Sequence, residues 1–215
     1  MQRFFIVLKP DGRQVFRLLV VGRKRLPEAG AYERFWGFVD RVEQSADAFA
    51  KGLRAFDYPT ETRGRRHEPA VRPAGEGAYA ITLLDGQMHL SYVLEQPRHP
   101  ADVQRAFRIA PEASFALSIK NPEASSPPEL GLGAREKTQF PEDLQEKFHD
   151  RRFEREDARV LARLRRGRII LVGARNDPER AYGTTLSDGH ADTFQELHLA
   201  KSQHPVKPLF EGQWQ

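Results

Sequence analysis

The sequence predicts an α+β fold in which antiparallel β-hairpins form one mixed or antiparallel sheet with several short helices. Two apolar, β-rich stretches, residues 4–21 and 79–94, are each interrupted by an Asp-Gly pair. Glycine, and to a lesser degree aspartate, tolerates the positive φ of a tight turn, so this pair between two such runs is a strong hairpin signal. A short helix is expected behind each hairpin, which suggests two β-β-α units that share one antiparallel sheet.

The composition excludes several classes of protein. The chain has 215 residues, of which 39% are hydrophobic and 10% aromatic, and this is enough for a substantial core. It has no cysteine, which excludes disulfides and thiolate metal sites. No run approaches the roughly 18 apolar residues that a membrane helix needs. We therefore expect a cytoplasmic protein with no membrane partner and no cofactor.

The first half of the chain predicts a strand, a helix and an exposed connection. Residues 36–42 alternate apolar and polar side chains, as a half-buried strand does. Ser45 is a suitable N-cap for a helix over residues 46–56. Residues 57–77 are polar, basic and interrupted by proline, and are interpreted as an extended strand plus an exposed connection. The apolar face of the expected helix consists of Phe49, Leu53 and Phe56.

Short elements are also expected after the second hairpin. Residues 99–102 are expected to open a short helix that has Pro100 in its first turn and ends near Phe107, and residues 114–120 are predicted to be a strand. Residues 123–139 contain Ser-Ser-Pro-Pro and Gly-Leu-Gly without periodicity. Connections of this length inside compact domains are uncommon, and we expect this one to be mobile.

The last third of the chain predicts three helices, one of them with an alternative. Helices are expected over residues 140–148 and over residues 156–166, where Gly167 would end the second helix before a buried strand at 169–172. In the alternative, residues 156–168 form a hairpin that turns at Arg166 and Gly167. The third helix is expected over residues 187–200, capped by Ser187 or Asp188.

The C-terminal tail carries more large apolar side chains than a solvated segment would. We expect a single domain over residues 1–201 and a docking tail over residues 202–215, which packs on the chain's own sheet or on a second copy of the chain. The apolar residues of the tail are Val206, Leu209, Phe210 and Trp214.

The arginines are concentrated in one part of the chain. The formal net charge is only +4, with a pI near 9.5, but residues 151–175 contain nine arginines and three acidic residues. Phosphate backbones attract clustered cations, and Phe148 and Phe153 between the arginines would permit stacking on bases. A second basic run covers residues 63–66. The residues expected to bind an anion are Arg63, Arg65, Arg66, Arg135, Arg163, Arg165, Arg166 and Arg168.

His89 and Lys120 are candidates for catalysis. His89 lies near Tyr92 in the second hairpin and would be a general base if it lined a cleft. Ser118 and Lys120 are spaced to share one face of a strand, the minimal form of a nucleophile pair. Residues 131–138 have the glycines, cations and hydroxyl of an anion cradle but not the Walker spacing.

The histidines and carboxylates near the C-terminal end do not predict a metal site. Ligands must converge on one point, and on a helix only Asp192 and Glu196 would share a face. On a strand, all four side chains of the set would point the same way. The helical interpretation is favoured by the apolar spacing, and no metal is expected. The set consists of His190, Asp192, Glu196 and His198.

No motif is specific enough to name a reaction. The sequence favours a binding protein for an anionic partner, either nucleic acid or a phosphorylated ligand, that acts through the arginine-rich segment. One alternative is an enzyme acting on a small phosphorylated or carboxylate substrate near residues 120–138. The other is an adaptor or assembly protein that docks, or forms a homo-oligomer, through its C-terminal tail.

Overall fold

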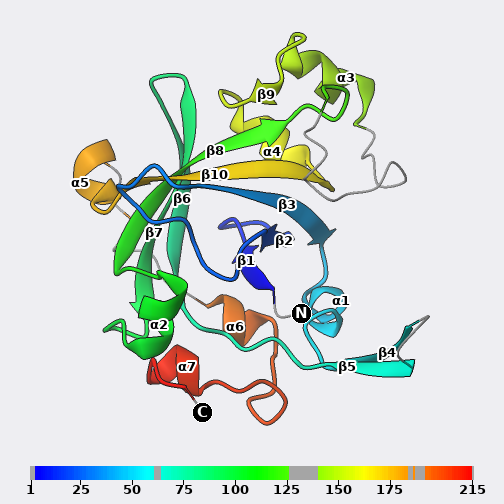
Figure 1. Ribbon diagram of the computed structural model, residues 1–215, viewed down its shortest axis with the longest axis vertical. Coiled ribbons are helices and arrows are strands. Elements are labelled where there is room, and N and C mark those ends of the chain that lie inside the picture. The colour runs from blue at the N-terminus through cyan, green and yellow to red at the C-terminus, as the bar shows by residue number, and fades with distance from the viewer. Residues whose placement is uncertain (1–2, 61–63, 126–139, 184–185, 187–191, 215) are drawn as a thin grey trace.

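The fold is one large curled antiparallel sheet, a half-barrel, with a small two-stranded sheet and short helices around it (Figure 1). The computed structural model describes residues 3–60, 64–125, 140–183, 186 and 192–214. Within them the order of the sheet is β1-β2-β3-β10-β8-β7-β6, and β9 pairs with β8. Its strands are β1 (Phe4–Leu8), β2 (Phe16–Val21), β3 (Arg34–Glu43), β6 (Glu76–Leu84), β7 (Gln87–Gln96), β8 (Glu112–Lys120), β9 (Phe153–Glu154) and β10 (Gly167–Arg175).

The α+β prediction and both predicted hairpins are confirmed. Leu84 and Gln87 pair across a two-residue turn in which Asp85 and Gly86 have φ values of 49° and 70°. The first hairpin has a longer loop, where Gly12 takes the positive φ. The two hairpins form the opposite edges of the sheet, so that β1 and β6 are its outermost strands.

The first helix is shorter than expected. Helix α1 (Ala46–Lys51) begins as predicted, with the Ala48 amide donating to Ser45 Oγ over 3.3 Å. It ends at Gly52, a poor helix former, and Phe56 is exposed in the next strand. Residues 57–77 were expected to form one strand and a connection, and the structure differs from this expectation. Their first part belongs to a hairpin of β4 (Phe56–Thr60) and β5 (Gly64–Glu68), and β6 begins at residue 76.

The structure decides between helix and hairpin in favour of helix. Helix α4 (Ala158–Arg163) forms within residues 156–168, for which the sequence allows either a helix or a hairpin. The helix ends at Arg163 and not at Gly167, which is buried as the first residue of β10. The expected helices near 101–107 and 140–148 are present as α2 (Asp102–Phe107), α3 (Glu142–Gln145) and the 3-10 turn η3 (Glu146–Phe148).

The prediction of one helix over residues 187–200 is wrong for the described residues 192–200. Only α6 (Thr193–Glu196) forms there, and His198 takes a φ of 49°, which is incompatible with a helix. Residues 187–191 lie outside the described residues, as does most of the connection expected to be mobile. Two further helices were not predicted: α5 (Pro178–Tyr182) and α7 (Lys207–Phe210).

Two hydrophobic clusters hold the fold together. The larger one lies on the inner face of the curl, because it joins residues of both edge hairpins, such as Leu8 and Met88, to the helices α3 and α4. The smaller one covers the other face of the first hairpin, where Phe16 packs against Phe49 of α1 and near Leu197. No helix in the described part of the chain is long and apolar enough to span a membrane.

Candidate functional site

Most arginines of residues 151–175 belong to one of two groups that differ in their ion pairing. Those of the first group pair with neighbouring carboxylates: Arg151 with Glu154 and Glu156, Arg155 with Glu156, Arg159 with Asp157, and Arg163 with Asp143. Arg163, which was expected to bind an anion, therefore already has an acidic partner. These pairs offer an external anion little attraction, because each arginine already lies next to a carboxylate of opposite charge.

The second group lies where β10 begins and β8 ends. Arg152, Arg165 and Arg166 are exposed and form no ion pair with a carboxylate of the described residues. Arg168 is half-buried on β10, opposite Phe38 of β3. We call Arg152, Arg165, Arg166 and Arg168 the arginine cluster.

Lys120 lies beneath this cluster. It is only 2% exposed, and its Nζ donates to the carbonyl oxygen of Asn121 over 2.7 Å and to that of Ala124. Burial lowers its pKa, and the charges of Arg152 and Arg168 lower the pKa further. Burial is the larger of these two causes, and the arginine charges add to it. A buried ammonium with two acceptors is not an accessible nucleophile, and the predicted pair with Ser118 is not supported.

Aromatic rings accompany the cluster on the same face of the sheet. The rings of Trp36 and Phe153 are 6.1 Å apart, and the Arg152 guanidinium lies 5.8 Å from the Phe153 ring centroid. Trp36, Phe38 and Phe153 are half-buried. Phe148, which was considered for stacking on bases, is instead fully buried in the core.

His89 belongs to a hydrogen-bonded chain on β7, β8 and α5. Its Nδ1 lies 3.0 Å from the Tyr182 hydroxyl, which lies 3.0 Å from Ser114 Oγ. The Arg175 amide donates to the same Oγ. Ser114 is fully buried, so it cannot contact a substrate, and the chain instead fixes α5 on the sheet. Tyr92, the expected neighbour, bonds to the backbone of Ala110 instead.

This chain predicts a pH dependence of stability. Burial, followed by the charge of Arg175, lowers the pKa of His89 below its ordinary value of 6.5. As the pH falls through that value, the unfolded chain takes up a proton before the folded chain does, so the free energy of unfolding decreases. We expect the His89→Gln variant to lose less thermal stability than the parent between pH 7.5 and pH 5, as followed by circular dichroism. An equal fall in melting temperature with pH in parent and variant would contradict this prediction.

The remaining candidates do not come together. The hairpin that carries Arg65 and Arg66 lies at the lower right of Figure 1, well away from β9 and α4. Arg63, Arg135 and His190 lie outside the described residues. Asp192 and Glu196 both pair with Lys9, and no group of three or more potential metal ligands occurs in the described part of the chain.

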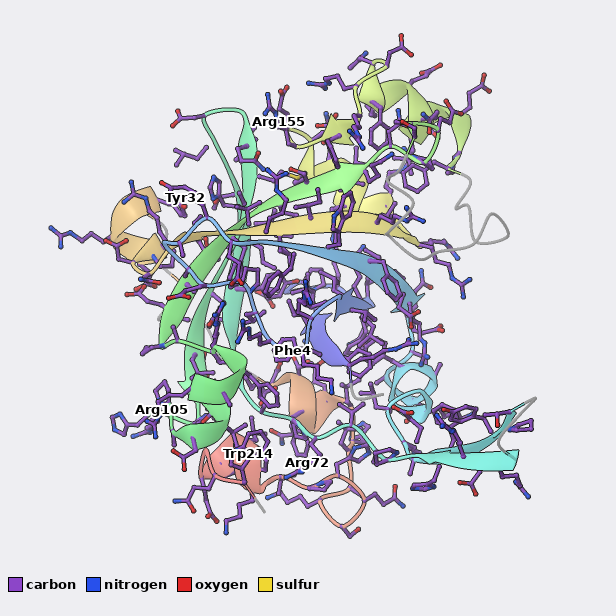
Figure 2. The ribbon with its side chains drawn as sticks, viewed as in Figure 1. Phe4, Tyr32, Arg72, Arg105, Arg155 and Trp214 are labelled. Atoms are coloured by element: carbon purple, nitrogen blue, oxygen red, sulfur yellow. The ribbon has the colours of Figure 1, made fainter. Side chains whose placement is uncertain are left out.

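A groove that no sequence pattern predicts runs along the free edge of β1. It has a volume of about 950 Å³ and is lined by all of β1, the start of β6, the end of β7, and parts of α2, α6 and α7. These segments are distant in sequence and meet only because the sheet curls. In Figure 2, Phe4 lies inside the curl, with Arg72 and Trp214 below it.

Comparisons of the chain with protein-family models, with curated proteins and with solved structures found no match.

Proposed function

We propose that the protein binds single-stranded nucleic acid through the arginine cluster and the half-buried rings of Trp36, Phe38 and Phe153. The observation that carries the proposal is that Arg152, Arg165 and Arg166, which form no ion pair with a carboxylate of the described residues, lie with aromatic rings at one end of one sheet face. Each phosphate bound by an arginine releases condensed counterions, which favours binding at low salt. A cytoplasmic location belongs to the same proposal.

The aromatic rings support a single strand over a duplex. In a duplex the bases are stacked on one another, whereas a single strand can stack its bases on protein rings. Arg152 lies against Phe153, so one site offers both a phosphate-binding cation and a stacking surface. The charges of Arg152 and Arg168 add to the effect of burial in lowering the pKa of Lys120, which agrees with a positive potential at this end of the sheet.

The enzyme alternative has less support. Its two residues, His89 and Lys120, lie at different places on the sheet and are engaged with Tyr182 and with backbone carbonyls. Neither lines the groove.

The test compares two triple variants with the same change in net charge. Arg152→Gln/Arg165→Gln/Arg166→Gln removes unpaired arginines, whereas Arg151→Gln/Arg159→Gln/Arg163→Gln removes arginines paired with carboxylates. Binding of a labelled oligothymidylate is measured by fluorescence anisotropy at several salt concentrations. We expect the first variant to bind more weakly and its salt slope to fall by about 2, which corresponds to roughly 0.7 for each lost contact. The second variant should retain most of the binding.

Fluorescence locates the contact. The chain has two tryptophans, so in the Trp214→Phe variant only Trp36 emits. Stacking of a base should quench this emission as the oligonucleotide is added. Absence of binding by the parent at low salt, or equal losses in both triple variants, would overturn the proposal. Circular dichroism melting curves check that each variant is folded.

A further inference from the structure

We propose that the groove along the free edge of β1 binds a small amphipathic anion, with an apolar chain inside the curl of the sheet and an anionic headgroup at the rim. The site is separate from the arginine cluster, and the proposal does not depend on nucleic-acid binding. Its support comes from the shape, the lining and the charge of the groove.

The groove exists because the barrel is not closed. Within the described residues β1 pairs only with β2, and β6 only with β7, so the outer edges of both strands remain unpaired. Both strands line the groove. Its volume lies near the upper end of the range of about 300–1,000 Å³ that is typical of small-molecule sites.

Hydrogen bonds hold the walls of the groove in place. Gln104 of α2 is fully buried, and its Nε2 donates to the carbonyl oxygens of Ala74, over 2.6 Å, and of Pro208, over 2.9 Å. One side chain thus connects α2 to the segment before β6 and to α7. On the opposite side, the Phe194 amide of α6 donates to Glu76 Oε1 over 2.6 Å. Such fixed walls indicate a preformed cavity, which reduces the entropy that a ligand must lose on binding.

The inner lining is apolar and aromatic. The Phe107 ring lies 5.6 Å from that of Phe4 and 5.4 Å from that of Trp214, so the three rings form a continuous wall. Burial raises the pKa of Tyr79 to about 12, which keeps this residue neutral. Other apolar residues of the lining include Ile6, Leu90, Leu94 and Ile109. Burial of an apolar chain in this space would stabilise the complex by about 25 cal/mol per Å² of apolar surface removed from water.

The rim of the groove carries an excess of positive charge. Six cations lie along it, and none of them pairs with a carboxylate of the described residues. Three acidic residues lie there too, and burial raises the pKa of one of them, Glu76, which favours its neutral form. This charge is complementary to a carboxylate or phosphate headgroup. The cations are Arg3, Lys24, Arg41, Arg54, Arg66 and Arg72, and the acids are Asp40, Glu68 and Glu76.

The binding test uses four probes. Dodecanoate and dodecyl phosphate share a chain but differ in headgroup, dodecanol lacks the charge, and butanoate lacks the chain. Isothermal titration measures each of them, and emission of Trp214 in the Trp36→Phe variant reports occupation of the groove. We expect both twelve-carbon anions to bind at least tenfold more tightly than dodecanol and butanoate. The tighter of the two anions identifies the headgroup. The proposal is overturned if dodecanol binds as tightly as the two anions, or if none of the four probes binds.

Variants test the location of the site. Arg41→Gln/Arg72→Gln removes two rim cations, and Arg34→Gln/Arg98→Gln removes two cations that do not line the groove. We expect about tenfold weaker binding of dodecanoate in the first double variant and unchanged binding in the second. Ala70→Trp places a bulky ring in the half-buried lining and should abolish binding without altering the core. Equal affinities of the two double variants, or full binding by a folded Ala70→Trp variant, would place the ligand elsewhere and overturn the proposal.

Discussion

Deletion of residues 205–215 should lower the melting temperature by about 10 °C. The tail contains α7, in which Leu209 is fully buried, and burial of such a side chain stabilises by about 1.5–3 kcal/mol. The deletion also removes two backbone acceptors, the carbonyl of Gly212 for the Val103 amide and that of Pro208 for Gln104. Loss of each such hydrogen bond costs about 1 kcal/mol. In a chain of this size, each kcal/mol lost from the free energy of unfolding lowers the melting temperature by about 2–4 °C.

Two further variants separate the parts of the tail. Deletion of residues 213–215 removes the half-exposed Trp214 but retains both acceptors, so it should cost much less. Leu209→Ala keeps the whole tail and should still destabilise by about 2–5 kcal/mol, because it leaves a cavity. Calorimetry measures all three proteins. Gel filtration tests the prediction that a homo-oligomer forms through the tail, which predicts a smaller size for the full deletion. Unchanged melting and unchanged size would show that the tail is dispensable.

The hairpins could be predicted because their signals are local. The turn at Asp85 and Gly86 requires two consecutive positive φ values, and this pair of residue types supplies them at low cost. The same holds for the start of α1, where Ser45 is adjacent to the amides that it caps. Sequence reasoning succeeds where cause and effect lie within a few residues of each other.

The ends of helices were predicted less well, because packing decides them. The spacing of Phe49, Leu53 and Phe56 is helical, yet the chain leaves the helix at Gly52 and still buries Leu53. The positive φ of His198 ends any helix beyond α6, although Leu197 is buried as its apolar spacing requires. The apolar patterns therefore indicated the burial of Phe49, Leu53 and Leu197 correctly, but they indicated the burial of Phe56 and the lengths of the helices incorrectly.

The candidate sites depend on contacts that are distant in sequence. Tyr182 lies 93 residues from His89, its hydrogen-bonding partner, and no pattern in the chain connects the two. The arginines of residues 151–175 look alike in the sequence, and only their positions in the fold separate Arg163, paired with Asp143, from the unpaired Arg165. The groove needs both edges of the curled sheet, so no single segment could have predicted it.

Substitution of Gly173 by alanine should destabilise the protein strongly. Gly173 lies in β10, at the centre of the sheet, and its amide donates to the Glu33 carbonyl over 2.9 Å. A Cβ atom at this position would overlap with the carbonyl oxygen of Glu28 and would lie 3.2 Å from the Ala29 amide nitrogen. Because these atoms belong to the backbone, neither strand nor loop can yield without moving its neighbours. We expect a loss of about 3 kcal/mol in the free energy of unfolding, the upper part of the usual range for overpacking.

Gly75→Ala is the matched control for this substitution. Its nearest contact would be Leu94 Cδ1 at 3.0 Å, the end of a flexible side chain, and its φ is not in the left-handed region. Rotation of that side chain relieves the contact, so the cost should stay below about 1 kcal/mol. Urea unfolding of both variants, followed by tryptophan fluorescence, gives the two free energies. A Gly173→Ala variant as stable as the control would mean that the Glu28 loop is not held against β10, and the packing at this end of the sheet would then need a different explanation.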